Sequence, residues 1–544
     1  MLEISVTSTE PVTGQPSITR RWLFDSRESV NNLVDARLEL PFDPTRASVP
    51  IQSSILKVEN GVNYAEGLPP VADYDFTDPD NMRALGFPTT LSAELGFVYA
   101  DDTSELVPSF YHSLVDAVVD DYDTYLTLTG ESFLSQLDKG LFYGGRYAST
   151  GIDGVTLLTE ILEDVVFRGE GGWNYILGSP SCVTSTTVPL WADSGFEYWV
   201  IDEELARLKV YLPIPVVSHR QAIQMVASYL GADVWTNRQG QIVISRGLYA
   251  GAPPDYTLDV DRVYDRPKRI RPTAIGAMDG KLYQYTYEAA ASEIASISVV
   301  VPSADIGETK AYRITHDGCH ASSLALTGAT LVGSPTYYTY STEFLASTSN
   351  QSFTATLTGK KVDLKAQTMR VTFVEGGVTA TYENPIASDA TYLQAAMREY
   401  VRMATAPQYE ISMRDDPAID NGDRLVLEQS TAREYAVPDA TAPTSGVTET
   451  HVVVGNITRE FSGSLNATYL LYENENRYIE DFSSLDDSES IIGYDGWVGS
   501  NATKTTIDNT PMVSVSSSDG ASAMKTVDLR VGSPLKLSVL IDEL

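Results

Sequence analysis

Most of the chain alternates between apolar and polar residues with a period of two, and Gly, Pro, Asn and Asp interrupt the alternation at short intervals. This pattern is typical of short β-strands joined by turns. From about 266 to 383 it continues without any helical period. The sequence therefore predicts a β-dominated, multidomain α+β fold. In the first 130 residues, strands are expected over 17–24, 36–40, 52–58, 94–99 and 124–129.

Four segments instead carry apolar residues at helical spacing. The first is expected over 129–140, with Thr129 as its cap and a glycine at its end. The second covers 154–167 behind Asp153 as cap. The last opens at Ser388 and ends before a proline at position 407.

The remaining helix, over 218–231, has the strongest local signature. Ser218 and Gln221 form a capping box, and Gly231 follows the last apolar residue. After it, residues 233–244 alternate around a turn at 237–240. We therefore expect 218–246 to be a helix packed on a two-stranded ribbon. The apolar stripe of this helix consists of Ile223, Val226, Ala227 and Leu230.

A strand-rich region then covers 407–475, and the composition changes directly after it. Residues 480–544 are acidic at first and then rich in Ser, Thr and Gly. At the usual size of a domain, 544 residues predict roughly three to five packed units. Within 407–475, strands are expected over 409–413, 424–428, 450–455 and 457–473, the last as a hairpin turning at Ser462-Gly463.

The composition supports a globular protein that does not bind nucleic acid. The chain has 38 Lys+Arg and 73 Asp+Glu, a net charge of −35, yet 43% of its residues are hydrophobic and 10% aromatic. A disordered acidic chain would lack this apolar content. Affinity for phosphate comes mainly from clustered cations, so a charge of −35 disfavours wrapping around nucleic acid.

Two cysteines, Cys182 and Cys319, exclude a disulfide framework and a multi-cysteine zinc site. The N-terminal residues lack the basic and apolar stretches of a signal peptide. No window reaches the roughly 18 apolar residues of a membrane helix. We expect a soluble product of cytoplasmic synthesis.

The tightest group of reactive side chains is His316, Cys319 and His320, which could offer two imidazoles and a thiolate to a metal. A tetrahedral zinc site needs four ligands, usually as two spaced pairs, and the remaining Cys and His residues form no second pair. The same residues suggest a Cys-His nucleophile without a third orienting group. The alternative is a polar turn between strands.

Enzyme signatures are absent. The segment 415–423 resembles a calcium loop, but Ala418 occupies a ligand position and no Glu closes the loop, which favours a Pro-Asx-Gly turn. No phosphate-binding, nucleophile-elbow or zinc-protease motif occurs. With 73 carboxylates, the sequence cannot show which pair would cleave a glycoside. We therefore predict no enzymatic activity, no catalytic residue and no cofactor.

Near the C-terminus, Tyr494, Asp495 and Trp497 are candidate contacts for a glycan or a partner. Aromatic faces stack on the apolar faces of sugar rings, and a carboxylate can accept hydrogen bonds from hydroxyl groups. The alternative is that the Trp side chain is buried in a small β-sandwich.

Several stretches, in their order along the chain, resemble the hub proteins of bacteriophage tails, also called baseplate hub or tail-tip proteins. No one of these motifs is specific, and the resemblance rests on their order. They are 124–139, the helix and hairpin of 222–245, Asn-Pro-Ile at 384–386 followed by a helix, 416–426 and 456–473.

The resemblance implies a homotrimer in which two β-barrel-like domains per chain build a ring of pseudo-sixfold symmetry that continues the hexameric tail tube. It also implies a division into five regions. These are a first barrel-like hub domain (1–130), an inserted α/β region (131–265), a β-rich domain ending in a helix (266–406), a second barrel-like hub domain (407–475) and a C-terminal extension similar to a β-sandwich (480–544).

By the same resemblance the chain is a structural virion protein at the distal tip of the tail, forming part of the DNA exit channel. The implied partners are the distal tail (tube-end) protein, the C-terminus of the tape-measure protein, and a tail fibre or receptor-binding protein. DNA would pass only in transit, and a host surface glycan is a further candidate partner. Two alternatives stay open: a cell-wall glycan hydrolase, and a glycan-binding adhesin that binds through 480–544.

Overall fold

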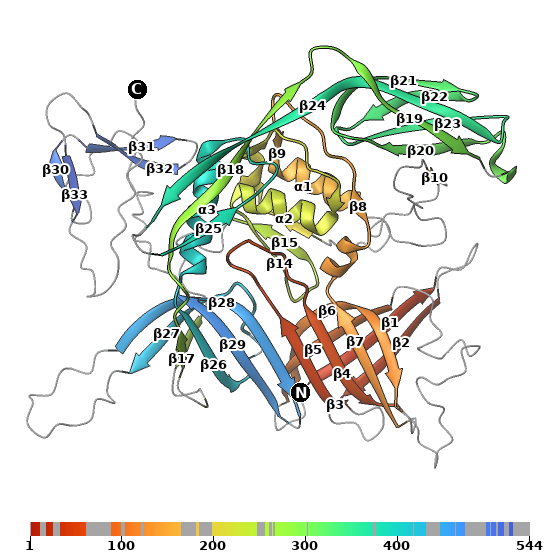
Figure 1. Ribbon diagram of the computed structural model, residues 1–544. Coiled ribbons are helices and arrows are strands. Elements are labelled where there is room, and N and C mark those ends of the chain that lie inside the picture. Colours follow the sequence, from red (N-terminus) through yellow and green to blue (C-terminus); the bar gives the residue numbers. More distant parts are fainter. Residues whose placement is uncertain are drawn as a thin grey trace, which may run out of the picture. The chain divides into compact units, whose positions relative to one another are not determined.

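The computed structural model (Figure 1) forms two compact units, Met1–Glu475 and Asn476–Leu544. Each is described by itself. The residues that the structure describes are 2–10, 18–25, 33–60, 89–98, 104–120, 124–164, 181–183, 199–246, 256–259, 264, 267–301, 303–373, 377–416, 418–430, 447–462, 464–473, 497–500, 502–507, 510–515 and 522–525.

The first 130 residues form an antiparallel array that we call the N-terminal lobe. Alternating apolar residues give each strand one buried face, as in β7, where Leu126 and Leu128 are buried and their neighbours are half-buried. Their strand order is β3-β4-β7-β6-β5-β1-β2. The expected strands are confirmed, whereas β1 and β6 were not expected. The bounds are β1 (Leu2–Glu10), β2 (Ile18–Asp25), β3 (Leu33–Leu40), β4 (Ser53–Glu59), β5 (Thr89–Val98), β6 (Ser104–Val119) and β7 (Tyr125–Glu131).

The C-terminal lobe continues the same sheet. Its order is β17-β26-β29-β28, with β27 on β28 and β16 parallel to β27. Strand β28 also pairs with β3, so both lobes share one 13-stranded sheet while each keeps its own apolar cluster. The expected strands are confirmed, although the expected break at 455–456 is a bulge within one strand. The bounds are β16 (Tyr256–Asp259), β17 (Lys268–Ile270), β26 (Gln408–Arg414), β27 (Arg424–Ser430), β28 (Val447–Phe461) and β29 (Leu465–Glu473).

Helices α1 (Gly154–Glu163) and α2 (His219–Leu230) form an α/β core with short strands. Both expected caps are confirmed: Thr156 N–H donates to Asp153 over 2.8 Å, and Gln221 N–H donates to Ser218 over 3.2 Å. Gly231 ends α2 in the left-handed region at φ 75°. The ribbon β14 (Asp233–Thr236) and β15 (Ile242–Ser245) has a third, parallel strand, β11 (Trp199–Ile201), that was not expected. The short elements are β8 (Leu141–Phe142), β9 (Ile152–Asp153), η3 (Glu203–Arg207), β12 (Lys209–Val210) and β13 (Val217–Ser218).

Two helix starts differ from the prediction. Thr129 caps no helix, because it lies within β7 and pairs with strands on both sides; a 3-10 helix, η2 (Phe133–Asp138), follows Ser132 instead. Helix α3 (Ala390–Ala404) is capped by Asp389, whose carboxylate accepts two backbone N–H groups, and not by Ser388. A carboxylate next to free N–H groups also suits the positive end of the helix dipole.

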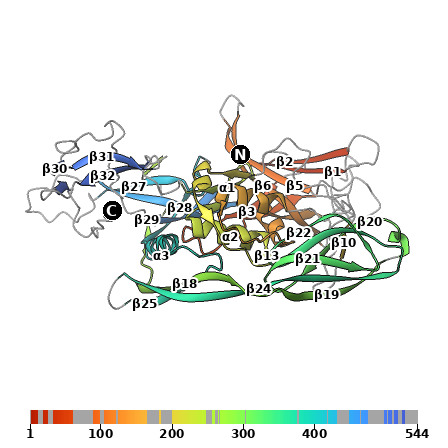
Figure 2. The same ribbon diagram turned by 90° about the horizontal axis from the view of Figure 1, so that it is seen from above.

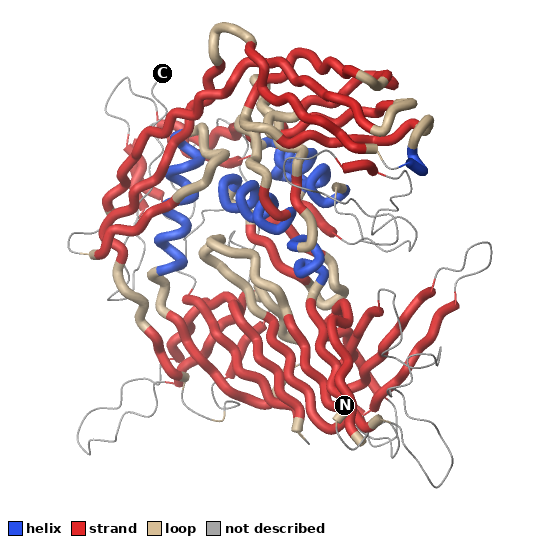
Figure 3. Tube along the Cα trace, turned by 45° about the vertical axis from the view of Figure 1, so that its right-hand side comes forward, coloured by secondary structure: helices blue, strands red, loops and turns tan. Residues whose placement is uncertain are grey.

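Residues 275–382, together with β10, form a β-arm, and no α-helix occurs in the described part of 266–383, as expected. Its long strands β18 and β24 run side by side (Figure 2), and β18 also contacts α3. Figure 3 shows most of the helices of this unit, in blue, beside the β-arm. The bounds are β10 (Ser181–Val183), β18 (Ile275–Tyr287), β19 (Ser292–Val300), η6 (Ser303–Asp305), β20 (Thr309–Thr315), β21 (Cys319–Thr327), β22 (Thr330–Tyr337), β23 (Ser341–Ser347), β24 (Ser352–Thr372) and β25 (Val378–Tyr382).

The second unit contains two antiparallel pairs. Strand β30 (Trp497–Ser500) pairs with β33 (Ser522–Lys525), and β31 (Ala502–Ile507) pairs with β32 (Thr510–Val515). Across the described parts of both units, no helix has the length and apolar character needed to span a membrane.

Candidate functional site

The most distinctive site is the joint between the two lobes, and β28 creates it by pairing with two different strands. Its first half pairs with β27, and its second half, residues 457–461, pairs with 36–40 of β3. The ladder shifts register at Gly455, where a Cβ atom would lie 2.1 Å from Cε2 of Tyr472. A side chain at this position would collide with the Tyr472 ring, so the bulge requires glycine and forms a corner of the sheet.

A buried ion pair lies at the joint. Arg459 of β28 is 1% exposed, and its Nε lies 3.0 Å from Oδ2 of Asp415, which is 0% exposed. Arg459 also donates to the carbonyl of Ile419 over 2.6 Å and to Oγ of Ser109, in β6 of the N-terminal lobe, over 3.3 Å. Tyr469 of β29 donates its hydroxyl proton to Asp415 over 2.7 Å. A buried charge pair of this kind is tolerable because its members are hydrogen-bonded on several sides.

Burial acts to lower the pKa of Arg459, but the nearby groups Asp415, Tyr469 and Asp420 together outweigh it and raise that pKa. Burial, and then the charge of Asp415, raise the pKa of Tyr469 far above its ordinary value. Arg459 therefore stays charged and Tyr469 stays a hydrogen-bond donor. The network holds strands of both lobes in place.

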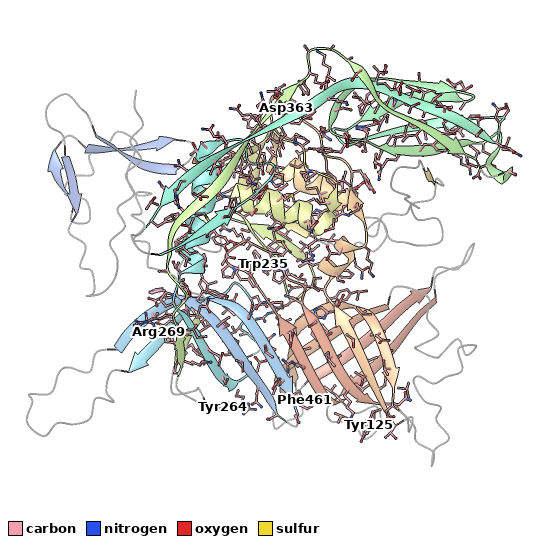
Figure 4. All side chains as sticks on the ribbon, viewed as in Figure 1. Tyr125, Trp235, Tyr264, Arg269, Asp363 and Phe461 are labelled. Carbon is pink, nitrogen blue, oxygen red and sulfur yellow. The ribbon has the colours of Figure 1, made fainter. Side chains whose placement is uncertain are left out.

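The segment 41–52 between β3 and β4, which we call the strap, ties the α/β core to the N-terminal lobe. Arg46 forms a two-bond ion pair with Asp233 of β14, with N–O distances of 2.7 and 2.9 Å; the side chain of Asp233 is buried and that of Arg46 is 10% exposed. Burial raises the pKa of Asp233, and Arg46 opposes this shift. Trp235 of β14, labelled in Figure 4, meets the ring of Phe42 edge-on, with ring centroids 6.1 Å apart. Three further hydrogen bonds join the strap to the core. Gln224 and Arg220 donate to the strap carbonyls of Ala47 and Val49. Gln52 of the strap donates to the carbonyl of Thr236.

The C-terminal lobe contacts the same segment. Asn421 donates its side-chain amide to the carbonyl of Leu40 over 2.6 Å, and Asn456 accepts from the backbone N–H of Phe42 over 3.0 Å. Arg238, in the turn of the α/β ribbon, forms an ion pair with Asp420 at 3.2 Å. Three regions that are far apart in sequence are thus hydrogen-bonded around one strap. The arrangement suits a rigid scaffold.

The structure brings together only two members of the group His316, Cys319 and His320. The sulfur of Cys319 lies 3.4 Å from Nδ1 of His316, whose other nitrogen is 3.1 Å from Oγ1 of Thr342. His320, the next residue in strand β21, points to the opposite face and packs on the ring of Tyr287.

Electrostatics also disfavour a metal at this place. Burial lowers the pKa of His316 and raises the pKa of Cys319 to about 11, so the thiol stays protonated at neutral pH. Metals bind the thiolate. No group of three or more His, Cys, Asp or Glu side chains in the described residues could hold a metal ion.

The segment 415–423 is a turn, as the sequence indicated. Gly422 has φ 81°, and Asp416 accepts a hydrogen bond from the backbone N–H of Ala418 over 3.0 Å. The role of Asp415 as the partner of Arg459 was not anticipated. One signal could have revealed it: Arg459 shares strand parity with Ile457 and Phe461, so an arginine falls on an apolar, inward-facing row.

Of the three candidate glycan contacts, Tyr494 and Asp495 lie outside the described residues. Trp497 is the first residue of β30, and its side chain is not described. A role for these residues in binding glycan or a partner stays a prediction.

The sequence matches no family model and no curated protein. Among solved structures, it is similar to the tail protein from Neisseria meningitidis MC58, with 9% identity, a TM-score of 0.44 and coverage of 87% of this chain and 96% of that one. It is also similar to the 43 kDa tail protein of prophage MuSo2 from Shewanella oneidensis, with 8% identity, a TM-score of 0.39 and coverage of 87% and 98%. A third match is the prophage tail protein gp18 from Listeria monocytogenes EGD-e, with 8% identity, a TM-score of 0.38 and coverage of 86% and 94%. Each of these three solved structures is described as a tail protein.

Proposed function

We propose that this protein is the structural hub at the distal tip of a phage tail, acting as a homotrimer. The observation that carries the proposal is the pairing of β28 with β3, which fastens two separately packed β lobes into one sheet. A threefold part can meet a sixfold tube only if each chain offers two similar surfaces. We propose that the two lobes of this chain supply those two surfaces and that each lobe is barrel-like.

The joint supports the same proposal because such a part must keep its two surfaces at a constant separation. The Arg459–Asp415 pair and the strap bind the lobes and the α/β core together through buried contacts. We therefore propose an architectural role without catalysis.

Charge supports a role in lining the DNA exit channel. Three chains of −35 carry 3 × −35 = −105 in total. A wall of this sign repels phosphate and offers DNA in transit no binding wells. We propose that the distal tail protein and the tape-measure C-terminus contact the ring. A tail fibre or receptor-binding protein would then contact the C-terminal extension at 480–544.

Two measurements test the proposal. Native mass spectrometry of the purified protein should give a trimer, and labelling of this protein on assembled particles should mark the distal tail. A ring of permanent subunits should bury well over roughly 2,000 Å². A monomer at every concentration, or label on the capsid, would remove the hub assignment.

The enzymatic alternative has its own test. Purified protein should leave peptidoglycan and common polysaccharides uncut. Turnover that one Asp or Glu substitution abolishes, without loss of fold, would establish a hydrolase in place of a purely structural part.

A further inference from the structure

Strand β17 ends the 13-stranded sheet on the side of the C-terminal lobe. Its three residues pair only with β26 among the described strands, so one edge of the strand faces away from the sheet. Figure 4 shows Arg269 of this strand on the C-terminal lobe. An open strand edge is a template for another chain unless charge or cover protects it.

This edge is basic, in contrast to the rest of the chain. Residues 266–271 contain Arg266, Lys268, Arg269 and Arg271 and no acidic residue, in a protein of net charge −35. The side chains of Lys268 and Arg269 are 68% and 45% exposed. Arg271 is also exposed. The edge therefore presents positive charge to whatever approaches it.

Neighbouring carboxylates neutralise part of this charge but not all of it. Lys268 lies 3.6 Å from Glu410 and Arg269 lies 3.3 Å from Glu473, both on the adjoining strands of the same lobe. Within the described residues Arg271 has no ion pair. An approaching acidic surface would find at least this cation unshared.

The part of the chain with complementary charge is the N-terminal lobe, whose described residues within 1–130 carry 5 Lys+Arg and 11 Asp+Glu. Residues 1–130 carry 7 Lys+Arg and 21 Asp+Glu, a net charge of 7 − 21 = −14. Within one chain, a strand of the C-terminal lobe already docks on the N-terminal lobe at the pairing of β28 with β3. An ion pair between Arg37 and Glu460, at 3.4 Å, crosses that joint.

We propose that the basic edge of β17 docks on the acidic N-terminal lobe of a second copy of this chain. The inference rests on the proposed trimer and names the surface that builds it. Each copy would use its C-terminal lobe twice, once on its own N-terminal lobe and once on that of the next copy. Such a head-to-tail contact closes into a ring of three when it rotates each copy by one third of a turn relative to the previous copy.

The test is charge reversal, read by native mass spectrometry and light scattering at equal concentration. The triple variant Lys268→Glu, Arg269→Glu, Arg271→Glu should dissociate, with an apparent Kd for assembly at least about tenfold higher than that of the unmodified protein. The matched control reverses three exposed cations of β24, Lys361→Glu, Lys365→Glu and Arg370→Glu, and should stay trimeric. Raising the salt concentration should weaken the unmodified trimer, because exposed charges are screened.

A second variant distinguishes loss of assembly from loss of the fold. Arg271→Glu alone breaks no ion pair within the described residues, so it should keep the circular dichroism spectrum and still weaken assembly. If both β17 variants remain as trimeric as the control, the edge serves only to repel stray strands and the proposed contact is wrong, while the hub proposal stands. If the unmodified protein is itself a monomer at every concentration, the proposed function fails together with its interface.

Discussion

The two lobes accommodate polar groups in their cores in opposite ways. The C-terminal lobe buries a full charge pair, in which Arg459 donates to Ser109 and to the carbonyl of Ile419, and Asp415 accepts from Tyr469. The N-terminal lobe buries one imidazole, His112, whose Nδ1 lies 2.9 Å from Oγ of Ser54 and whose Nε2 has no partner among the described residues. We expect substitution of either charged residue to destabilise the C-terminal lobe, and low pH to destabilise the N-terminal lobe.

Breaking the charge pair should have the largest effect. Arg459→Met leaves Asp415 buried and uncompensated, so we expect a loss of about 3–5 kcal/mol in the free energy of unfolding. Calorimetry together with hydrogen exchange in β3 and β28 would measure it. The double variant Arg459→Met, Asp415→Leu removes both charges and should lose clearly less than the sum of the single losses. Additive losses would show that the two groups do not interact.

The corner at Gly455 comes next. Gly455→Ala places a Cβ within 2.1 Å of the Tyr472 ring, and the overpacking should cost about 1–3 kcal/mol. Tyr472→Leu in the same chain makes room and should recover part of the loss. Equal stability of Gly455→Ala and the unmodified protein, by thermal unfolding, would mean that the bulge tolerates a side chain and does not define the joint.

His112 makes the N-terminal lobe sensitive to acid. Burial lowers its pKa from 6.5 to about 3 in the folded state, so the unfolded chain binds a proton first as the pH falls. The contribution is fully present above pH 6.5 and is lost as the pH falls toward 3. At pH 5 the loss is on the order of 2 kcal/mol.

Hydrogen exchange of β4 and β6 between pH 7.5 and 5 tests this prediction. His112→Gln should flatten the pH dependence, whereas His320→Gln, at an exposed histidine, should leave it unchanged. Parallel curves for the His112 variant and the unmodified protein would assign the acid sensitivity to other groups.

The smallest predicted loss of stability lies outside both lobes, at the start of α2, and serves as a reference for the larger losses. Ser218→Ala removes the oxygen that accepts from Gln221 N–H at the start of α2, and should cost about 1 kcal/mol. Ser218→Thr keeps a hydroxyl that can accept from Gln221 N–H and donate to Asp138, and should retain most of the stability. A loss of the size expected for Arg459→Met would instead point to the bond from Ser218 to Asp138 as the more important contact.

Local patterns were sufficient for the elements whose signals lie within a few residues. Helix α2, with its box, stripe and glycine stop, was predicted with its ends, and so were most strands. The helix expected from Thr129 was wrong because β7 gains ladder partners from β4 and β6, which the local sequence does not reveal.

The joint was not predictable from the sequence because its contacts span most of the chain. Phe42 and Asn456 are 414 positions apart, and nothing local specifies that β28 chooses β3 as its second partner. The Arg459–Asp415 pair left one trace, an arginine on an inward-facing row. The region 415–423 showed only its turn chemistry.

A reconstruction of the purified assembly by electron cryomicroscopy tests the central claim most directly. The account predicts a closed ring of three chains with six β lobes around its axis, in which β28 and β3 of each chain are paired. A stable single chain, or a ring in which the two lobes of a chain separate and do not alternate around the axis, would contradict it.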